Sequence, residues 1–308
     1  MIGLILLTLR ELRARKVVVG LFVVATLVWV VLAFALQLDV VDGSLAGARL
    51  FGEETVEEAD VAELDDPVLD SETGEPLVDP ETGEPVTRRD RLDFGDTLLE
   101  YVVFGAQAFV AGAAYWIGIL LALFATGGLV ASLVEPGQVD VVLTKPLSRS
   151  AVLAGRLAGV WLTMFALVVY LFGAVWLVMS VKSGIWNPKF LLAIGAVFGM
   201  FAVLYGVVAL VGAWSGSAPL SLISTLALLF VTLVLAIPGL ADQVSRFWRP
   251  VVQGLYHVLP KFGSVGTSLV PQLATGAPVT SLVPLLTSLL FGAACYLGAF
   301  ALFSRKDY

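Results

Sequence analysis

The side chains that could carry out chemistry are few and widely separated. Cys295 is the only cysteine and His257 the only histidine in the 308 residues, and Cys295 lies inside an apolar run. One cysteine cannot form an intramolecular disulfide, and these two residues cannot supply the ligands of a cysteine or histidine metal cluster. We therefore expect no catalytic residue, no metal and no cofactor, and we interpret Cys295 as a small buried thiol.

Nucleotide hydrolysis by the phosphate-binding loop is excluded as well. That loop contains a Gly-Lys pair, and none of the six lysines of this chain follows a glycine. No Ser-His-acid triad can be assembled around the single histidine. The chain is thus predicted not to be an enzyme, and any ATP hydrolysis is expected in a partner subunit.

The hydrophobic residues are too numerous for a soluble domain. They make up 58% of the chain, and the mean hydropathy is +0.94. Six runs free of charged residues are long enough to cross a hydrocarbon core of about 30 Å, and each should be helical because a lone strand leaves its backbone unpaired in lipid. The chain is therefore predicted to be an all-α integral membrane protein with six transmembrane helices, at 17–38, 105–134, 157–181, 190–214, 220–237 and 281–303.

These expected spans contain no Asp, Glu, Lys, Arg or His. Proton- and ion-coupled carriers usually place ionisable groups at membrane depth, because those groups carry the coupling charge. The uncharged spans therefore disfavour a proton-coupled carrier, although a sodium site made of backbone oxygens would escape this test.

The acidity of the chain is concentrated in one loop, 39–100. This loop holds 20 of the 25 acidic residues and only four arginines. It includes a tandem repeat, VLDSETGEP at 68–76 and LVDPETGEP at 77–85, whose glycines predict successive turns. Calcium could bind carboxylates there, but the spacing matches no known calcium loop, and a solvated acidic segment is the favoured interpretation.

Orientation follows from the lysines and arginines near the ends of the spans. With the amino terminus inside, the cytoplasmic segments 1–16, 135–156 and 304–308 hold nine of them, against two in 182–189 and three in 238–280. Both termini are therefore predicted to be cytoplasmic and loop 39–100 external. Residues 1–16 favour an amphipathic interfacial helix, with an ordinary basic flank as the alternative.

The cytoplasmic connection between the second and third spans, 135–156, is the most informative segment. A break at Glu135-Pro136-Gly137 precedes a short apolar stretch that ends at Leu143. A basic turn with Lys145 and Pro146 follows, and Ser148 or Ser150 could cap the next helix. The simplest interpretation of this segment is a connector that carries positive-inside charges.

This segment, however, resembles the ABC-2 type permeases of ATP-binding-cassette transporters. The matching positions are Glu135, Gly137, Leu143, Lys145, Pro146, Ser148, Arg149, Gly155 and Arg156, together with the ending Phe303–Tyr308. The likeness covers nearly the whole chain apart from loop 39–100, which is longer than in the commonest form of the family. Within the family it is closest to permeases linked to multicopper-enzyme maturation.

The resemblance implies a specific architecture. Segment 1–16 would be an elbow helix, 238–280 would dip into the outer leaflet, and 135–150 would be a coupling helix docked on a separate ATP-binding cassette subunit. The residues implied to contact that subunit are Glu135, Gly137, Val142, Leu143, Lys145, Pro146, Ser148 and Arg149. A second permease copy, as homodimer or heterodimer, and the lipid bilayer would be the other partners, with no nucleic acid.

The sequence therefore predicts the permease subunit of an ATP-driven transporter, with export as the expected direction, in the plasma membrane of a prokaryote.

 Two alternatives remain open, an ion-coupled secondary carrier and a non-transporting scaffold or sensor whose acidic loop binds a partner. Small residues spaced by four could allow two helices to approach closely, within one chain or between two copies. These pairs are Gly155–Gly159, Gly195–Gly199 and Gly212–Gly216.

Overall fold

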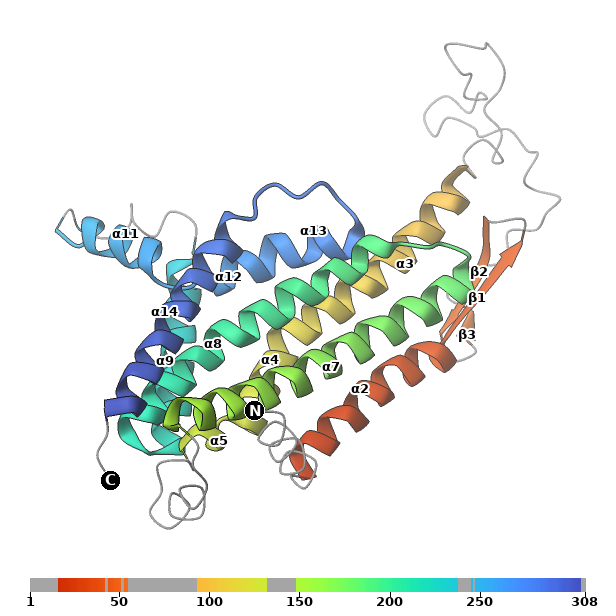
Figure 1. Cartoon of the computed structure of the whole chain (residues 1–308). Coiled ribbons are helices and arrows are strands. Elements are labelled where there is room, and N and C mark those ends of the chain that lie inside the picture. The colour runs from red at the N-terminus through yellow and green to blue at the C-terminus, as the bar shows by residue number, and fades with distance from the viewer. Residues whose placement is uncertain are drawn as a thin grey trace. The chain divides into compact units, whose positions relative to one another are not determined.

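The computed structural model describes residues 16–41, 44–50, 53–54, 93–131, 148–237, 245 and 247–305. Within these ranges the regular elements are helices, apart from one small sheet (Figure 1). The longer helices are α2 (Lys16–Ala35), α3 (Asp93–Ala113), α7 (Arg149–Ser183), α8 (Ala193–Ser215), α9 (Ala218–Leu235) and α14 (Val283–Arg305). The shorter ones are α4 (Ile119–Thr126), α5 (Gly128–Ala131), α11 (Arg249–Val258), α12 (Phe262–Ser264) and α13 (Val270–Thr275). Three further turns are the π turns η3 (Ala114–Gly118) and η5 (Val265–Leu269) and the 3₁₀ turn η4 (Pro188–Leu192).

Five helical segments of the described chain are long and apolar enough to cross a membrane. They are Leu99–Ala131, Ser150–Ser183, Pro188–Ser215, Ala218–Leu235 and Val283–Arg305. A shorter apolar helix, Val18–Phe34, coincides with the first expected span. The predicted helical membrane architecture is therefore confirmed, while the count of six spans stays a prediction.

The helices extend beyond several of the expected spans. The second helical segment begins at Asp93, where the charge pattern placed the start of the span at Gly105. Its first residues include Asp96, because a helix can continue past its apolar part into water. The third begins at Arg149 rather than at Leu157 for the same reason. The interfacial helix expected at 1–16 lies outside the described residues except for Lys16, the first residue of α2.

A three-stranded antiparallel sheet departs from the all-helical prediction. Strand β1 (Leu36–Val41) pairs with β2 (Ser44–Leu50), which pairs with β3 (Glu53–Glu54). Since β1 follows α2 directly, residues 36–38 of the first expected span are extended. Strand pairing satisfies the backbone N–H and C=O groups that the helix no longer pairs. The acidic repeat at 68–85 lies outside the described residues.

The chain forms two compact units. The first comprises residues 1–26, 108–173 and 188–308, and the second comprises 27–107 and 174–187. Helix α8 is the centre of the first unit, where most of its residues are buried and α5, α9 and α14 pack against it. Its core position explains why α8 is apolar on all sides rather than on one face.

Helices α8 and α14 approach each other at two glycines. A Cβ atom on Gly206 would lie 3.1 Å from the carbonyl oxygen of Gly292, and a Cβ on Gly292 would lie 3.0 Å from the Cα of Val203. The two backbones thus meet with no side chain between them, as small residues allow in membrane helices. The hydroxyl of Tyr296 on α14 donates to the carbonyl of Ala202 on α8 at 2.6 Å, which adds a polar link to the same pair.

Candidate functional site

The predicted coupling segment lies almost entirely outside the described residues. Its first six members fall within 132–147, namely Glu135, Gly137, Val142, Leu143, Lys145 and Pro146. The structure describes Ser148 directly before α7 and Arg149 as the first residue of that helix. The contact of these eight residues with an ATPase therefore stays a prediction.

Ser148 caps α7, as one of the two serines was predicted to do. Its Oγ accepts a hydrogen bond from the backbone N–H of Ala151 at 3.3 Å. Its carbonyl oxygen accepts from the N–H groups of Ala151 and Val152 at 2.9 and 3.2 Å. A serine in this position satisfies N–H groups that have no partner inside the helix. The end of the coupling segment is thus fixed to the start of a membrane-length helix.

Most buried polar side chains of the described helices bond to their own helix. Each of six hydroxyls donates to a carbonyl three or four residues earlier, and these belong to Thr126, Ser183, Ser221, Thr225, Thr232 and Ser288. Such a bond satisfies the hydroxyl without a second helix, which suits an environment that offers no water. Cys295 is buried with a free thiol, as expected, and no group of three His, Cys, Asp or Glu among the described residues could hold a metal ion.

A different arrangement occurs in the second unit, in a group of residues that we name the polar corner: Gln107, Trp176, Ser180, Trp186 and Asn187. Gln107 lies on the buried face of α3 and is 0% exposed. Its Oε1 accepts a hydrogen bond from Nδ2 of Asn187 at 2.9 Å. The indoles of Trp176 and Trp186 meet edge to face, with ring centroids 5.2 Å apart. The corner therefore joins α3, the last turns of α7 and the chain that follows α7.

The turn after α7 places these side chains. Gly184 adopts φ +75°, a left-handed conformation that favours glycine, and its N–H donates to the carbonyl of Ser180 at 2.9 Å. The Oγ of Ser183 accepts from the N–H of Ile185 at 3.1 Å. The helix thus ends in a turn held by hydrogen bonds, and the turn positions Trp186 and Asn187.

Three atoms of the polar corner have no hydrogen-bond partner among the described residues. They are Nε2 of Gln107, Nε1 of Trp176 and Oγ of Ser180, all three buried. They are the only buried side-chain nitrogen and oxygen atoms of the described chain in this condition. Buried polar groups are normally paired, so an exception marks a place where something else can bind.

The first unit contains an aromatic contact formed by Tyr115, Trp116, Phe262 and Gly266. The Tyr115 and Phe262 rings stack with centroids 4.5 Å apart, and Trp116 meets Phe262 edge to face at 5.3 Å. The hydroxyl of Tyr115 donates to the carbonyl of Phe262 at 2.6 Å. A Cβ on Gly266 would lie 2.5 Å from a ring carbon of Tyr115, so only glycine leaves space for the ring. The contact joins the π turn η3 to α12 and the π turn η5, and π turns often occur at functional sites.

Helix α11 is amphipathic and has no buried residue. Its apolar residues Val251, Leu255 and Val258 are exposed and recur at intervals of four and three. The polar residues Gln253 and His257 lie on the opposite side, because a helix turns about 100° per residue. This pattern is typical of a helix that lies along a membrane surface.

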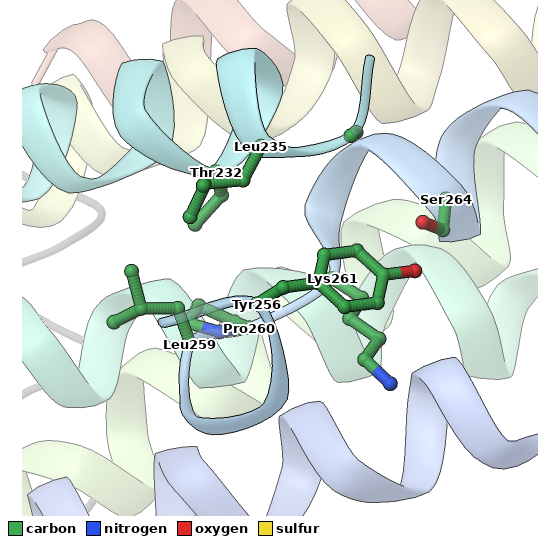
Figure 2. Close-up of a pocket in the computed structure, with 8 residues that line it drawn as sticks. Thr232, Leu235, Tyr256, Leu259, Pro260, Lys261 and Ser264 are labelled. Atoms are coloured by element: carbon green, nitrogen blue, oxygen red, sulfur yellow. The ribbon is translucent and has the colours of Figure 1, made fainter. Parts of the chain in front are cut away.

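A small pocket lies between the end of α9, the end of α11 and the start of α12, as Figure 2 shows. Its volume is about 200 Å³, including space open to solvent, and its lining residues are Thr232, Leu235, Ala236, Tyr256, Leu259, Pro260, Lys261 and Ser264. The ammonium of Lys261 lies over the Tyr256 ring, 4.9 Å from its centroid. The backbone N–H of Lys261 donates to Oγ of Ser288 at 2.8 Å, which ties the pocket to α14.

Sequence reasoning did not find the polar corner or the aromatic contact. Gln107 is uncharged, so the pattern of ionisable side chains along the expected spans does not reveal it. A carboxamide inside an otherwise apolar run would have marked this helix, since it can neither be ionised nor bond fully to its own backbone. The π turns leave no comparable signal in the residue pattern.

Two comparisons with known proteins bear on the family of the chain. A search of curated proteins gives no match. The sequence model of a family described as "ABC-2 family transporter protein" matches residues 6–308. This match includes the predicted coupling segment, the five membrane-length helices of the described residues and the carboxyl terminus, and it extends over well more than half of the chain. The chain belongs to the ABC-2 family of transporter proteins, as a membrane subunit.

Proposed function

We propose that this chain is the permease subunit of an ATP-driven exporter and that a separate ATP-binding cassette subunit supplies the energy. The observation that carries the proposal is the family match over residues 6–308. The absence of a Gly-Lys pair from the sequence supports the division of labour, because the chain has no phosphate-binding loop of its own.

The ATPase contact in this proposal is the segment from Glu135 to Arg149. Val142 and Leu143 would fill an apolar groove on the partner, and Lys145 and Arg149 would pair with acidic residues at its rim. Ser148 supports this role, since its cap fixes the end of the segment to α7. A movement of the segment would therefore pass directly into a helix of membrane length.

The proposed arrangement in the membrane is a dimer of six-span chains with both termini in the cytoplasm of a prokaryotic cell. The span that completes the six is the first along the chain, 17–38, which contains the shorter apolar helix Val18–Phe34. Loop 39–100 and segment 238–280 are then external. The exposed apolar residues of α11 support a place for that helix at the outer membrane surface, where its polar side faces water.

The ATPase contact is tested with the full chain carrying an affinity tag in its native host. An ATP-binding subunit should co-purify and be identified by mass spectrometry. Leu143→Asp places a charge in the proposed groove and should weaken that contact by on the order of 2 kcal/mol, which is about thirtyfold in affinity. Lys145→Ala removes a charge at the rim and should have a smaller effect.

Both variants should still insert into the membrane, which their retention in the membrane fraction after alkaline carbonate extraction can verify. Full partner binding and full ATP-dependent transport by Leu143→Asp would contradict the coupling assignment. Transport that needs an ion gradient and no ATPase would indicate a secondary carrier. Direction is measured in inside-out vesicles, where an exporter accumulates its substrate in the lumen.

The orientation is tested by cysteine labelling in a Cys295→Ala background. Ser71→Cys should react with a membrane-impermeant thiol reagent in intact cells, because loop 39–100 is proposed to be external. Ser304→Cys should react only after the cells are permeabilised, since it lies at the carboxyl-terminal end of the last membrane-length helix, Val283–Arg305, which is proposed to be cytoplasmic. Labelling at position 304 but not at position 71 in intact cells would contradict the proposed orientation.

A further inference from the structure

The polar corner concentrates unpaired hydrogen-bonding atoms in a part of the chain where they are costly. Nε2 of Gln107, Nε1 of Trp176 and Oγ of Ser180 have no partner among the described residues. Gln107 and Ser180 are 0% and 1% exposed. Burying a polar group without a hydrogen-bond partner costs free energy, and the cost is larger in lipid because no water is available to pair with the group. One bound molecule could satisfy all three atoms.

The three atoms define the chemistry of such a molecule. Gln107 Nε2 and Trp176 Nε1 can only donate, whereas the Ser180 hydroxyl can donate or accept. The other polar atom of the Gln107 side chain, Oε1, already accepts from Asn187. The missing partner must therefore present acceptor atoms, such as carbonyl, ester or hydroxyl oxygens.

The charges near the corner favour an uncharged acceptor. Lys182 is the only basic residue within 174–187, and its ammonium donates to the carbonyl of Ala33 near the end of α2. On α7, Trp176 and Ser180 share a face, while Lys182 lies about 240° around the helix from Trp176. The only acidic residue within 99–107, Glu100, is exposed. The charge of Lys182 is thus not on the face that carries the unpaired atoms of α7, and Glu100 lies about two helical turns from Gln107.

Apolar surface adjoins the same turns of α7. Leu177 and Val181 directly follow Trp176 and Ser180 and are 53% and 69% exposed, and Trp186 is 57% exposed. A molecule whose oxygen atoms reach the unpaired donors could therefore lay a hydrocarbon chain against this surface. The corner also lies at the end of the membrane-length segment Ser150–Ser183, where tryptophan and lysine are typical of the membrane–water interface.

We propose that the polar corner binds a neutral amphiphile through a carbonyl or hydroxyl oxygen of its head group, with the hydrocarbon chain against Leu177 and Val181. Gln107 and Trp176 donate to this oxygen, and Ser180 completes the site. The assignment of this amphiphile as a transported substrate rests on the proposed function, whereas the binding itself does not.

The binding is tested with the full chain in nanodiscs made of ether-linked phosphatidylcholine, which lacks ester carbonyls. The tryptophan indoles are labelled with ¹⁵N, and the Trp176 signal is assigned by its loss in Trp176→Phe. Titration with monoolein, an uncharged amphiphile with one ester and two hydroxyls, should move the Trp176 indole proton downfield in a saturable way. The Trp161 signal should not move, because its Nε1 already donates to the hydroxyl of Tyr296 at 3.1 Å.

Two variants and one further probe complete the test. Gln107→Met should weaken monoolein binding by about tenfold, which corresponds to the loss of one hydrogen bond. Thr163→Val is the matched control, because Thr163 lies on α7 as Trp176 does but its hydroxyl donates to the carbonyl of Gly159, and this variant should bind as the wild type does. The indole signals of the other tryptophans report whether each variant is folded. 1-Octadecene, a hydrocarbon without oxygen, should leave the Trp176 signal in place.

Several outcomes would overturn the proposal. One is a Trp176 signal that monoolein does not move, which would mean that water alone satisfies the indole. Another is an equal shift with 1-octadecene, and a third is unchanged binding by a folded Gln107→Met variant. One further outcome separates the two proposals. If the chain binds monoolein but shows no ATP-dependent transport, the proposed function is contradicted and the proposed binding site is not.

Discussion

The aromatic contact of the first unit and the polar corner of the second both bury hydrogen-bonding side chains between helical segments, but they differ in how fully those groups are paired. The hydroxyl of Tyr115 donates to the carbonyl of Phe262 at 2.6 Å, inside stacked rings. In the polar corner Oε1 of Gln107 is paired with Nδ2 of Asn187, but Nε2 of Gln107, Nε1 of Trp176 and Oγ of Ser180 have no partner among the described residues.

The difference indicates two kinds of role. A contact whose buried hydroxyl is paired and whose rings leave no space for a Cβ at Gly266 stabilises one arrangement, and any change to it should be costly. A set of unpaired donors stabilises the chain little by itself but is ready for a ligand. We therefore expect substitutions in the aromatic contact to lower the free energy of unfolding strongly, and substitutions in the polar corner to affect it weakly.

The largest effect is expected from Gly266→Ala. The new Cβ would lie 2.5 Å from Tyr115 and 2.7 Å from Trp116, so buried rings would have to move. Overpacking of this kind costs about 3 kcal/mol. Gly254→Ala, in exposed helix α11 with no atom within 4 Å, should instead be neutral or slightly stabilising. Unfolding of the purified protein in detergent measures both, and equal stability of the two variants would contradict the tight packing.

A smaller loss is expected from Tyr115→Phe. This change keeps the stacked ring but removes the hydroxyl, which leaves the Phe262 carbonyl without that donor. The expected loss is about 2 kcal/mol, measured in the same unfolding experiment. Tyr101→Phe is the matched control, since Tyr101 is 77% exposed and its substitution should change stability little. An equally small effect at Tyr115 would show that its hydrogen bond contributes little.

The smallest effect is expected from Gln107→Leu in nanodiscs free of added amphiphile. The change removes the hydrogen bond to Asn187, which destabilises the protein, and it also removes the buried unpaired Nε2, which stabilises it. The two effects partly cancel. The stability should change by about 1 kcal/mol or less. A loss as large as that of Gly266→Ala would mean that the polar corner is a structural element, and the contrast between the two regions would fail.

The sequence predicted the membrane architecture because lipid imposes simple requirements. A span must be long, apolar and helical, and these properties appear directly in the residue order. Ser148 was predictable as a helix cap for a similar reason, since the side chain acts on its own backbone. The strand Leu36–Val41 was not predicted, because a short apolar segment after a span fits a helix or a strand equally well.

Contacts between distant segments could not be predicted in the same way. The glycine pairs spaced by four included Gly199, which faces Leu285 and Leu289 of α14, but not Gly206 or Gly292, where the backbones of α8 and α14 meet. Their partners come from different helices, and spacing within one helix carries no information about the second. The pairing of Gln107 with Asn187, 80 residues apart, depends likewise on how α3 and the turn after α7 are placed.

The crossing of α8 and α14 has a mechanical consequence. Where Gly206 and Gly292 meet, each backbone fills the notch left by the missing side chain of the other. Sliding by even one residue would bring a larger neighbour into that notch, and the hydrogen bond from Tyr296 to Ala202 would break. The two helices should therefore move together as one rigid body. Any bending that a conformational change requires must then occur elsewhere in the chain.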